Sequence, residues 1–176
     1  LVEQRSTEDG NVYSDLSPVL ALGELTDGVT NLELTAAYAA AANGGSYIEP
    51  VFYTRVEDQE GNVILSNESQ PVGVMKASTA YLLTDALTEA AQTGLGAGLH
   101  FQIYDMPVAG ISGSSSESND LWAVGYTPYY TAVVWSGYDN NQSQTNTVYH
   151  QNIWRDAMER IHEEKGLSFR EFDMPD

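Results

Sequence analysis

The stretch that decides the fold is PVAGISGSSSESNDLWAVGYTPYYTAVVWSGY, residues 107–138. Three of its segments, 107–113, 121–127 and 131–138, are rich in β-branched, aromatic and small residues, which is typical of strands. The Ser-rich loop 114–120 and the turn Pro128-Tyr129-Tyr130 separate these segments. The stretch therefore predicts three consecutive β-strands.

A helix is predicted after the third strand, over residues 152–165, and Gly166 is expected to end it. The apolar face of this helix is expected to contain Ile153, Trp154, Ala157, Met158 and Ile161. Three strands followed by an amphipathic helix favour an antiparallel sheet covered by that helix. The sequence therefore predicts the α+β class, with 107–165 as a strand-strand-strand-helix segment.

Two further helices and a hairpin are predicted before residue 107. Thr30 and Glu33 have capping-box spacing, and Asn43-Gly44-Gly45 follows, so a helix is expected over 30–45. Ser78 is the expected N-cap of a helix that runs to Gln92. Its predicted apolar face consists of Leu82, Leu83, Ala86, Leu87 and Ala90. Residues 48–56 and 63–65, separated by a polar turn, predict a hairpin.

Composition excludes several classes of protein. Seven Lys and Arg against 25 Asp and Glu give a net charge of −18, which repels phosphate and anionic lipid, so no nucleic-acid partner is expected. The absence of cysteine excludes disulfides and thiolate metal sites. No apolar run is long enough to span a membrane and no signal peptide is visible. The polar start without Met is interpreted as that of a fragment or a processed chain.

Several segments together resemble, in the same order, the second half of the transpeptidase domain of class A penicillin-binding proteins. The match runs over about 16–160. The matching segments are LALG at 20–23, GVTNLEL at 28–34, ANGG at 42–45, TAYLLTD at 79–85, PVAGISGS at 107–114, DLWAVGYTP at 120–128 and AVVWSGYD at 132–139. The resemblance implies that 1–176 is the C-terminal portion of one transpeptidase-like domain, with a poorly defined lead-in over about 1–15. The implied fold is part of the penicillin-binding and serine β-lactamase type.

In that family three motifs build the active site: Ser-x-x-Lys, Ser-x-Asn and Lys-Thr-Gly. The serine hydroxyl is a weak nucleophile and needs a nearby base, which a lysine can supply. Here neither Lys76 nor Lys165 has a serine three residues earlier, and no serine has an asparagine two residues later. No catalytic residue is therefore assigned in this chain, and the first two motifs are expected upstream of it.

The third motif is present in altered form as Ile111-Ser112-Gly113-Ser114. The resemblance assigns Ser112, Gly113 and Ser114 to substrate binding, because hydroxyls and a glycine backbone can hold a peptide carboxylate and line an oxyanion hole. Ile111 stands at the lysine position and offers no charge. Residues 77–154 contain no Lys or Arg, so an anionic substrate would lose a charge-assisted hydrogen bond worth about 1.5–3 kcal/mol.

Each of the remaining patterns has a structural explanation as well as a functional one. His100, His150 and His162 have no metal-ligand spacing, so no metal and no cofactor is expected. The glycine-rich 93–98 follows a helix and lacks a lysine, which indicates a connector rather than a phosphate loop. Residues 114–120 fit either a binding lip or a connector. At least two of Trp122, Trp135 and Trp154 are expected in the core.

The resemblance implies a peptidoglycan D,D-transpeptidase segment for cell-wall cross-linking, outside the cytoplasmic membrane and anchored through a segment not present here. The implied partners are peptidoglycan stem peptides, β-lactams and the preceding part of the domain. A homodimer or swapped assembly is a further expectation, because incomplete sheets expose edges. The alternative is a catalytically degenerate domain that acts as a structural or interaction module at the cell surface.

Overall fold

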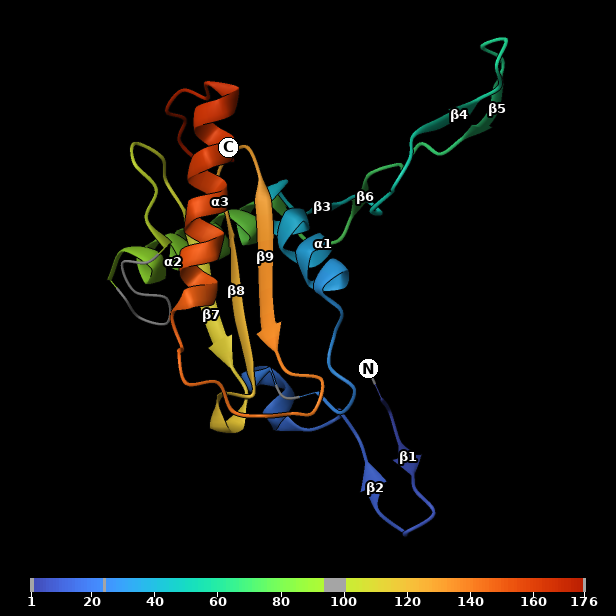
Figure 1. The fold of residues 1–176 in the computed structure, drawn as a ribbon, viewed down its shortest axis with the longest axis vertical. Coiled ribbons are helices and arrows are strands. Elements are labelled where there is room, and N and C mark those ends of the chain that lie inside the picture. Colours follow the sequence, from blue (N-terminus) through green and yellow to red (C-terminus); the bar gives the residue numbers. More distant parts are fainter. Residues whose placement is uncertain (1, 24, 94–100, 176) are drawn as a thin grey trace.

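The structure is a computed structural model that describes residues 2–23, 25–93 and 101–175. Its centre is a three-stranded antiparallel sheet of β7 (Ala109–Ser114), β8 (Asp120–Tyr126) and β9 (Thr131–Gly137), in that order (Figure 1). The expected sheet and the α+β class are confirmed. Strand β8 is central and nearly all buried, so β7 and β9 are the edges of this sheet.

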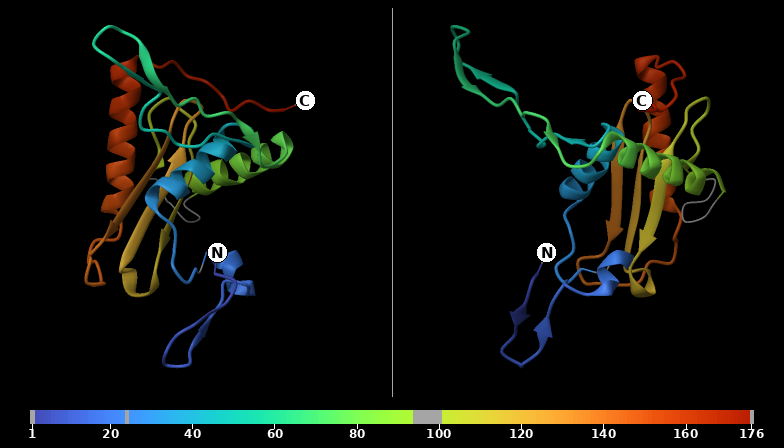
Figure 2. Two further views of the ribbon diagram at one scale, coloured as in Figure 1. Left: turned by 90° about the vertical axis from the view of Figure 1, so that its right-hand side faces the viewer. Right: turned by 180° about the vertical axis from the view of Figure 1, so that it is seen from behind.

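Helices cover both faces of the sheet (Figure 2). Helix α3 (Tyr149–Lys165) packs on one face, while α1 (Asn31–Ala42) and α2 (Ala77–Thr93) lie on the other. The larger apolar cluster lies between the sheet and α3 and includes Phe101, Ala123, Trp154 and Met158. A smaller cluster on the other face is formed by Leu87, Ala109 and Tyr126.

Helix α3 begins earlier than the sequence predicts, and its predicted apolar face is only partly correct. Trp154 and Met158 are buried as expected, together with His150, Gln151 and His162. Ile153 and Ile161, which were expected on this face, are 50% and 36% exposed, and Ala157 is exposed as well. Because His150, Trp154, Met158 and His162 recur every four residues, they lie along one side of the helix.

The ends of α1 follow the prediction. Thr30 and Glu33 form the expected capping box, and the helix stops at Asn43. Gly45 has φ +89 and its carbonyl accepts hydrogen bonds from the N–H groups of Val74 and Met75. A Cβ at this position would collide with the Met75 carbonyl, so only glycine fits here.

Two predictions about α2 are wrong. The helix begins at Ala77, so Ser78 lies inside it and does not cap it. The buried residues of α2 are Ala80, Thr84, Leu87 and Ala91, whereas Leu82 and Leu83 are exposed. Small side chains let α2 approach the sheet closely, and the Thr84 and Tyr126 hydroxyls share a buried hydrogen bond of 2.8 Å.

The predicted hairpin exists, but its first strand is shorter than expected. Strands β4 (Arg55–Glu57) and β5 (Val63–Ser66) pair with each other and extend away from the sheet (Figure 1). Residues 48–53 form no strand, and β3 (Ser46–Tyr47) pairs instead with β6 (Val72–Gly73). The predicted connector over 93–98 lies almost wholly outside the described residues. None of the helices described is long and apolar enough to cross a membrane.

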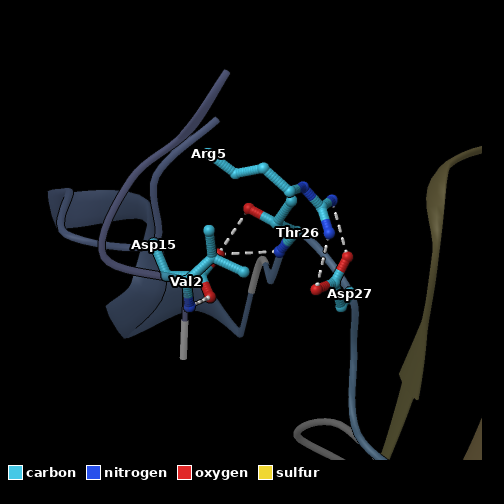
Figure 3. Close-up of polar contacts among 5 residues, drawn as sticks. All are labelled: Val2, Arg5, Asp15, Thr26 and Asp27. Carbon is cyan, nitrogen blue, oxygen red and sulfur yellow. Dashed lines mark hydrogen bonds and ion pairs between the residues drawn. The ribbon is translucent and has the colours of Figure 1, made fainter. Parts of the chain in front are cut away.

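The N-terminal region is held together by carboxylates (Figure 3). It contains β1 (Arg5–Ser6), β2 (Val12–Tyr13) and a 3₁₀ helix (Pro18–Leu22). The Asp15 carboxylate accepts hydrogen bonds from the Val2 N–H and from the N–H and hydroxyl of Thr26, at 2.6–2.7 Å. Arg5 makes a two-pronged contact with Asp27, at 2.8 and 3.1 Å.

Gly125→Ala is expected to destabilise the fold. Its Cβ would lie 2.8 Å from Trp154 Cζ2 and 3.1 Å from the Ala109 carbonyl oxygen, both deep in the core. Overpacking of this kind lowers the free energy of unfolding by about 1–3 kcal/mol. Gly113→Ala is the matched control, because its Cβ would meet nothing within 4 Å, and its effect should stay within about 0.5 kcal/mol. Equal denaturant midpoints for the two variants would contradict this account.

Acid is expected to weaken the hydrogen bonds of Asp15 that hold the N-terminal region together. Hydrogen bonds, first that of the Thr26 hydroxyl, lower the pKa of Asp15 from 3.8 to about 2. Because the pKa is depressed in the folded state, the stabilisation is complete above pH 4 and is lost as the pH falls towards 2. Hydrogen-exchange protection at the Thr26 amide should therefore decrease over this window. Asp15→Asn should lower protection already at pH 6, and constant protection from pH 5 to 2 would refute the assignment.

Candidate functional site

The four residues of the altered third motif lie in sequence on β7, at the edge of the sheet. The register pairs Ile111 with Val124 and Gly113 with Trp122. Because paired residues project on the same side of a sheet, Ile111 and Gly113 lie on the face towards α1 and α2. Ser112 and Ser114 alternate with them and lie on the opposite face. The motif therefore presents its backbone at the sheet edge, with hydroxyls on only one side.

Ile111 is half-buried and packs against the cluster of Leu87, Ala109 and Tyr126. A β-branched side chain suits both the strand and this apolar contact. The position is therefore occupied by a packing residue that offers neither a charge nor a proton.

The two hydroxyl positions differ in exposure. Ser112 is half-buried and Ser114 is exposed, next to the equally exposed Gly113. A Cβ at Gly113 would meet no atom within 4 Å, so there is open space above this point of the strand. A ligand could approach the backbone closely at Gly113.

The cations of the chain lie elsewhere or are already paired. All five arginines contact a carboxylate: Arg5 with Asp27, Arg55 with Glu57, Arg155 with Asp156, Arg160 with Glu164 and Arg170 with Asp173. Lys76 immediately precedes α2 and Lys165 ends α3. In contrast, two carboxylates, Glu117 and Asp120, follow β7 directly. The local charge beside the motif is negative.

The loop after β7 is ordered by its own hydrogen bonds. The Ser115 hydroxyl accepts from the Asp120 N–H at 2.8 Å, and the Ser115 N–H donates to the Asp120 carbonyl at 3.0 Å. Glu117 and Ser118 have φ values of 58 and 57, which non-glycine residues rarely adopt. These conformations are held within a loop whose ends are joined by the bonds between Ser115 and Asp120.

Only one of the three tryptophans is fully in the core, so the expectation of at least two is wrong. Trp154 is completely buried, whereas Trp135 is 42% exposed and Trp122 is half-buried. The rings of Trp122 and Trp135 lie 6.3 Å apart on the face that α1 and α2 cover incompletely. The Trp135 Nε1–H donates to Asp120 Oδ1 at 3.0 Å. Strand alternation places this pair beside Gly113.

The two histidines that the structure describes, His150 and His162, are not arranged as metal ligands. His162 is buried and contacts the Thr127 hydroxyl and the Met158 carbonyl, at 3.0 and 2.7 Å. His150 is buried on the same helix, and burial lowers its pKa. His100 lies outside the described residues. In the part of the chain that the structure describes, no three His, Asp or Glu side chains are arranged to hold a metal ion.

Two clefts among the described residues lie away from residues 111–114. The larger, of about 430 Å³, lies between α2, the segment before β7 and the C-terminal tail. The smaller, of about 330 Å³, is lined by α1 and the β3 and β6 region. The candidate site is therefore an open strand edge rather than an enclosed pocket.

Sequence comparison identifies relatives over most of the chain. The family model for the penicillin-binding protein transpeptidase domain matches residues 6–159. Penicillin-binding protein 1A of Clostridium acetobutylicum is 36% identical over 159 residues, which are 89% of this chain and 19% of the relative. Penicillin-binding protein 2D of Bacillus subtilis is 35% identical over 81% of this chain and 21% of the relative. The chain thus spans about a fifth of these relatives.

Solved structures share the fold. The penicillin-binding protein PonA1 from Mycobacterium tuberculosis superposes with a TM-score of 0.69 and 24% identity, over 82% of this chain and 41% of that one. Penicillin-binding protein 1A from Haemophilus influenzae gives a TM-score of 0.68 at 18% identity, over 84% and 28%. These similarities establish the arrangement of sheet and helices, and the sequence matches establish descent. This chain belongs to the penicillin-binding protein transpeptidase family.

Proposed function

We propose that residues 1–176 are the C-terminal portion of a peptidoglycan D,D-transpeptidase domain that cross-links the bacterial cell wall. The observation that carries the proposal is the position of Ser112-Gly113-Ser114 on an open edge strand, within a chain of this family. An edge strand has backbone groups that can pair with an extended peptide, and D-Ala-D-Ala stem peptides are extended ligands. The nucleophile would come from a Ser-x-x-Lys motif in a preceding part of the same domain.

In this reaction a serine oxygen attacks the carbonyl carbon between the two D-Ala residues. The carbonyl oxygen becomes an oxyanion, the terminal D-Ala leaves with a proton, and an acyl-enzyme forms. The amine of a neighbouring stem peptide then attacks the acyl-enzyme and releases the serine. The backbone of β7 near Gly113 would stabilise the oxyanion, while Ser112 and Ser114 would orient the substrate. The chain alone is expected to acylate nothing.

A second candidate function is that of a degenerate domain, kept as a structural or interaction module at the cell surface. Ile111 favours it, because that side chain packs into an apolar cluster and leaves the strand without a cation. Under both functions the protein would lie outside the cytoplasmic membrane, anchored through a segment beyond this chain. The net charge of −18 argues against nucleic acid as a partner.

The deciding measurement is the intact mass of the longer protein, expressed with its upstream coding sequence, after incubation with a penicillin. An added mass equal to the drug, lost when the upstream serine is changed to alanine, is expected for an active domain. Ile111→Lys should then raise the acylation rate by about tenfold or more, because one charge-assisted hydrogen bond is restored.

Other outcomes separate the two functions. An adduct that forms only in Ile111→Lys would mean that this position alone disabled an otherwise complete site. A folded protein that forms no adduct with several β-lactams, with or without the substitution, would favour the second function, that of a non-catalytic structural or interaction module.

The 176-residue chain by itself is expected to self-associate. Strand β7 pairs only with β8 in the described sheet and forms one of its edges, and sheet edges pair readily with other chains. The net charge opposes association, so added salt should strengthen it by screening. Light scattering should show a dimer whose population rises with protein and salt concentration. A strict monomer at high concentration in 0.5 M salt would contradict the expectation.

A further inference from the structure

A glutamine outside the family motif holds the loop that follows the candidate site. Gln144 lies in the connection between β9 and α3, which passes beside the loop between β7 and β8 (Figure 1). Gln144 is 9% exposed, although both of its sequence neighbours are exposed. The large majority of buried polar side chains have hydrogen-bond partners inside the protein.

Every hydrogen-bonding position of the Gln144 amide is used. Its Nε2 donates to the carbonyl oxygens of Asn119 and Ser136, both at 2.9 Å. Its Oε1 accepts from the hydroxyls of Ser136 and Tyr149, both at 2.5 Å. A primary amide has two donor hydrogens and two acceptor lone pairs, so the partners also determine which end is nitrogen.

The backbone of Gln144 adds a second contact to the loop between β7 and β8, beside the bond from Nε2 to Asn119. Its N–H donates to the Ser118 carbonyl at 3.1 Å. Gln144 therefore holds Ser118, the second of the two left-handed residues, and Asn119, which follows it. These bonds fix the loop from outside, in addition to its own hydrogen bonds.

The hydrogen bonds from Gln144 to the loop are connected to the candidate site through a short series of further bonds. Asn119 precedes Asp120, which is joined to Ser115 by the backbone and side-chain bonds described above. Ser115 directly follows Ser114, the last residue of β7. The position of Gly113 and Ser114 at the strand edge thus depends on where the loop is held.

We propose that Gln144 is a positioning residue for ligand binding and acylation at the β7 edge, an inference that rests on the proposed transpeptidase function. It touches no ligand itself. It holds residues 115–120 in one conformation, so that the backbone near Gly113 is already in place when a peptide or β-lactam arrives. Preorganised donors of this kind lower the reorganisation required during the reaction.

Gln144→Glu is the test variant. It keeps the size and both acceptor positions, but it replaces the two Nε2 donors with a carboxylate oxygen that faces two carbonyl oxygens. Ser143→Ala is the matched control, because it removes only the exposed 3.2 Å bond to Asn119 Oδ1 from the adjacent position. Thermal unfolding of both variants is measured first, and all comparisons are made well below the lower melting temperature.

The first readout is hydrogen exchange in the 176-residue chain. Amides over 117–121 should exchange at least tenfold faster in Gln144→Glu and less than twofold faster in Ser143→Ala, while α3 amides from 154 onward stay unchanged. Unchanged exchange in the loop would overturn the proposal. Equally faster exchange everywhere would mean general destabilisation and would overturn it as well.

The second readout is the acylation of the longer protein by a penicillin. Gln144→Glu should lower the second-order rate constant at least tenfold at pH 8, and the loss should diminish at lower pH, because a protonated carboxyl can donate one hydrogen bond again. Faster loop exchange without any change in acylation would overturn the positioning role. Failure of the unsubstituted protein to acylate would instead refute catalysis itself, and the positioning role with it.

Discussion

The fold depends on the packing of one indole ring between two strands and the segment that precedes the sheet. Trp154 is fully buried, and its Nε1–H donates to the Ala132 carbonyl of β9 at 2.9 Å. Its ring lies 4.7 Å from that of Phe101 and covers Gly125 of β8. A single side chain thus joins α3, strands β8 and β9, and the segment that leads to β7. Large aromatic side chains of this kind contribute most of the apolar burial in a small core.

The location of the candidate site follows from that packing. Because α3 is fixed against β8 and β9, β7 is left as the outer strand on the α2 side, held by its register to β8 and by the contact of Ala109 with Leu87 and Tyr126. Its first two residues, Ala109 and Gly110, are buried, and its last two, Gly113 and Ser114, are exposed. The strand therefore begins in the rigid core and ends at an accessible surface. Binding strands at sheet edges need both properties.

The sequence predicts the local features well and the long-range ones poorly. The three strands, the Thr30 capping box and the stop of α1 at Asn43 follow from neighbouring residues, so each could be predicted. The buried face of α2 could not be, because it is selected by the close approach of Thr84 to Tyr126 rather than by hydrophobicity. The same limit applies to the site. Family motifs identify Ser112-Gly113-Ser114, whereas Gln144 carries no local signal, since its partners lie 8 and 25 residues away.

The replacement of lysine by Ile111 changes the charge of the site more than its shape. A lysine at the same register position would lay its methylene stem on the Leu87 and Tyr126 surface and extend its ammonium beyond it, as long amphipathic side chains do. Isoleucine fills the same apolar contact with a side chain that favours strands, so the backbone of β7 has no reason to move. Loop 115–120 is held from the opposite face by Gln144, independently of position 111. The backbone geometry that a peptide would meet can therefore persist without a cation at position 111, and the missing charge acts on the strength of carboxylate binding.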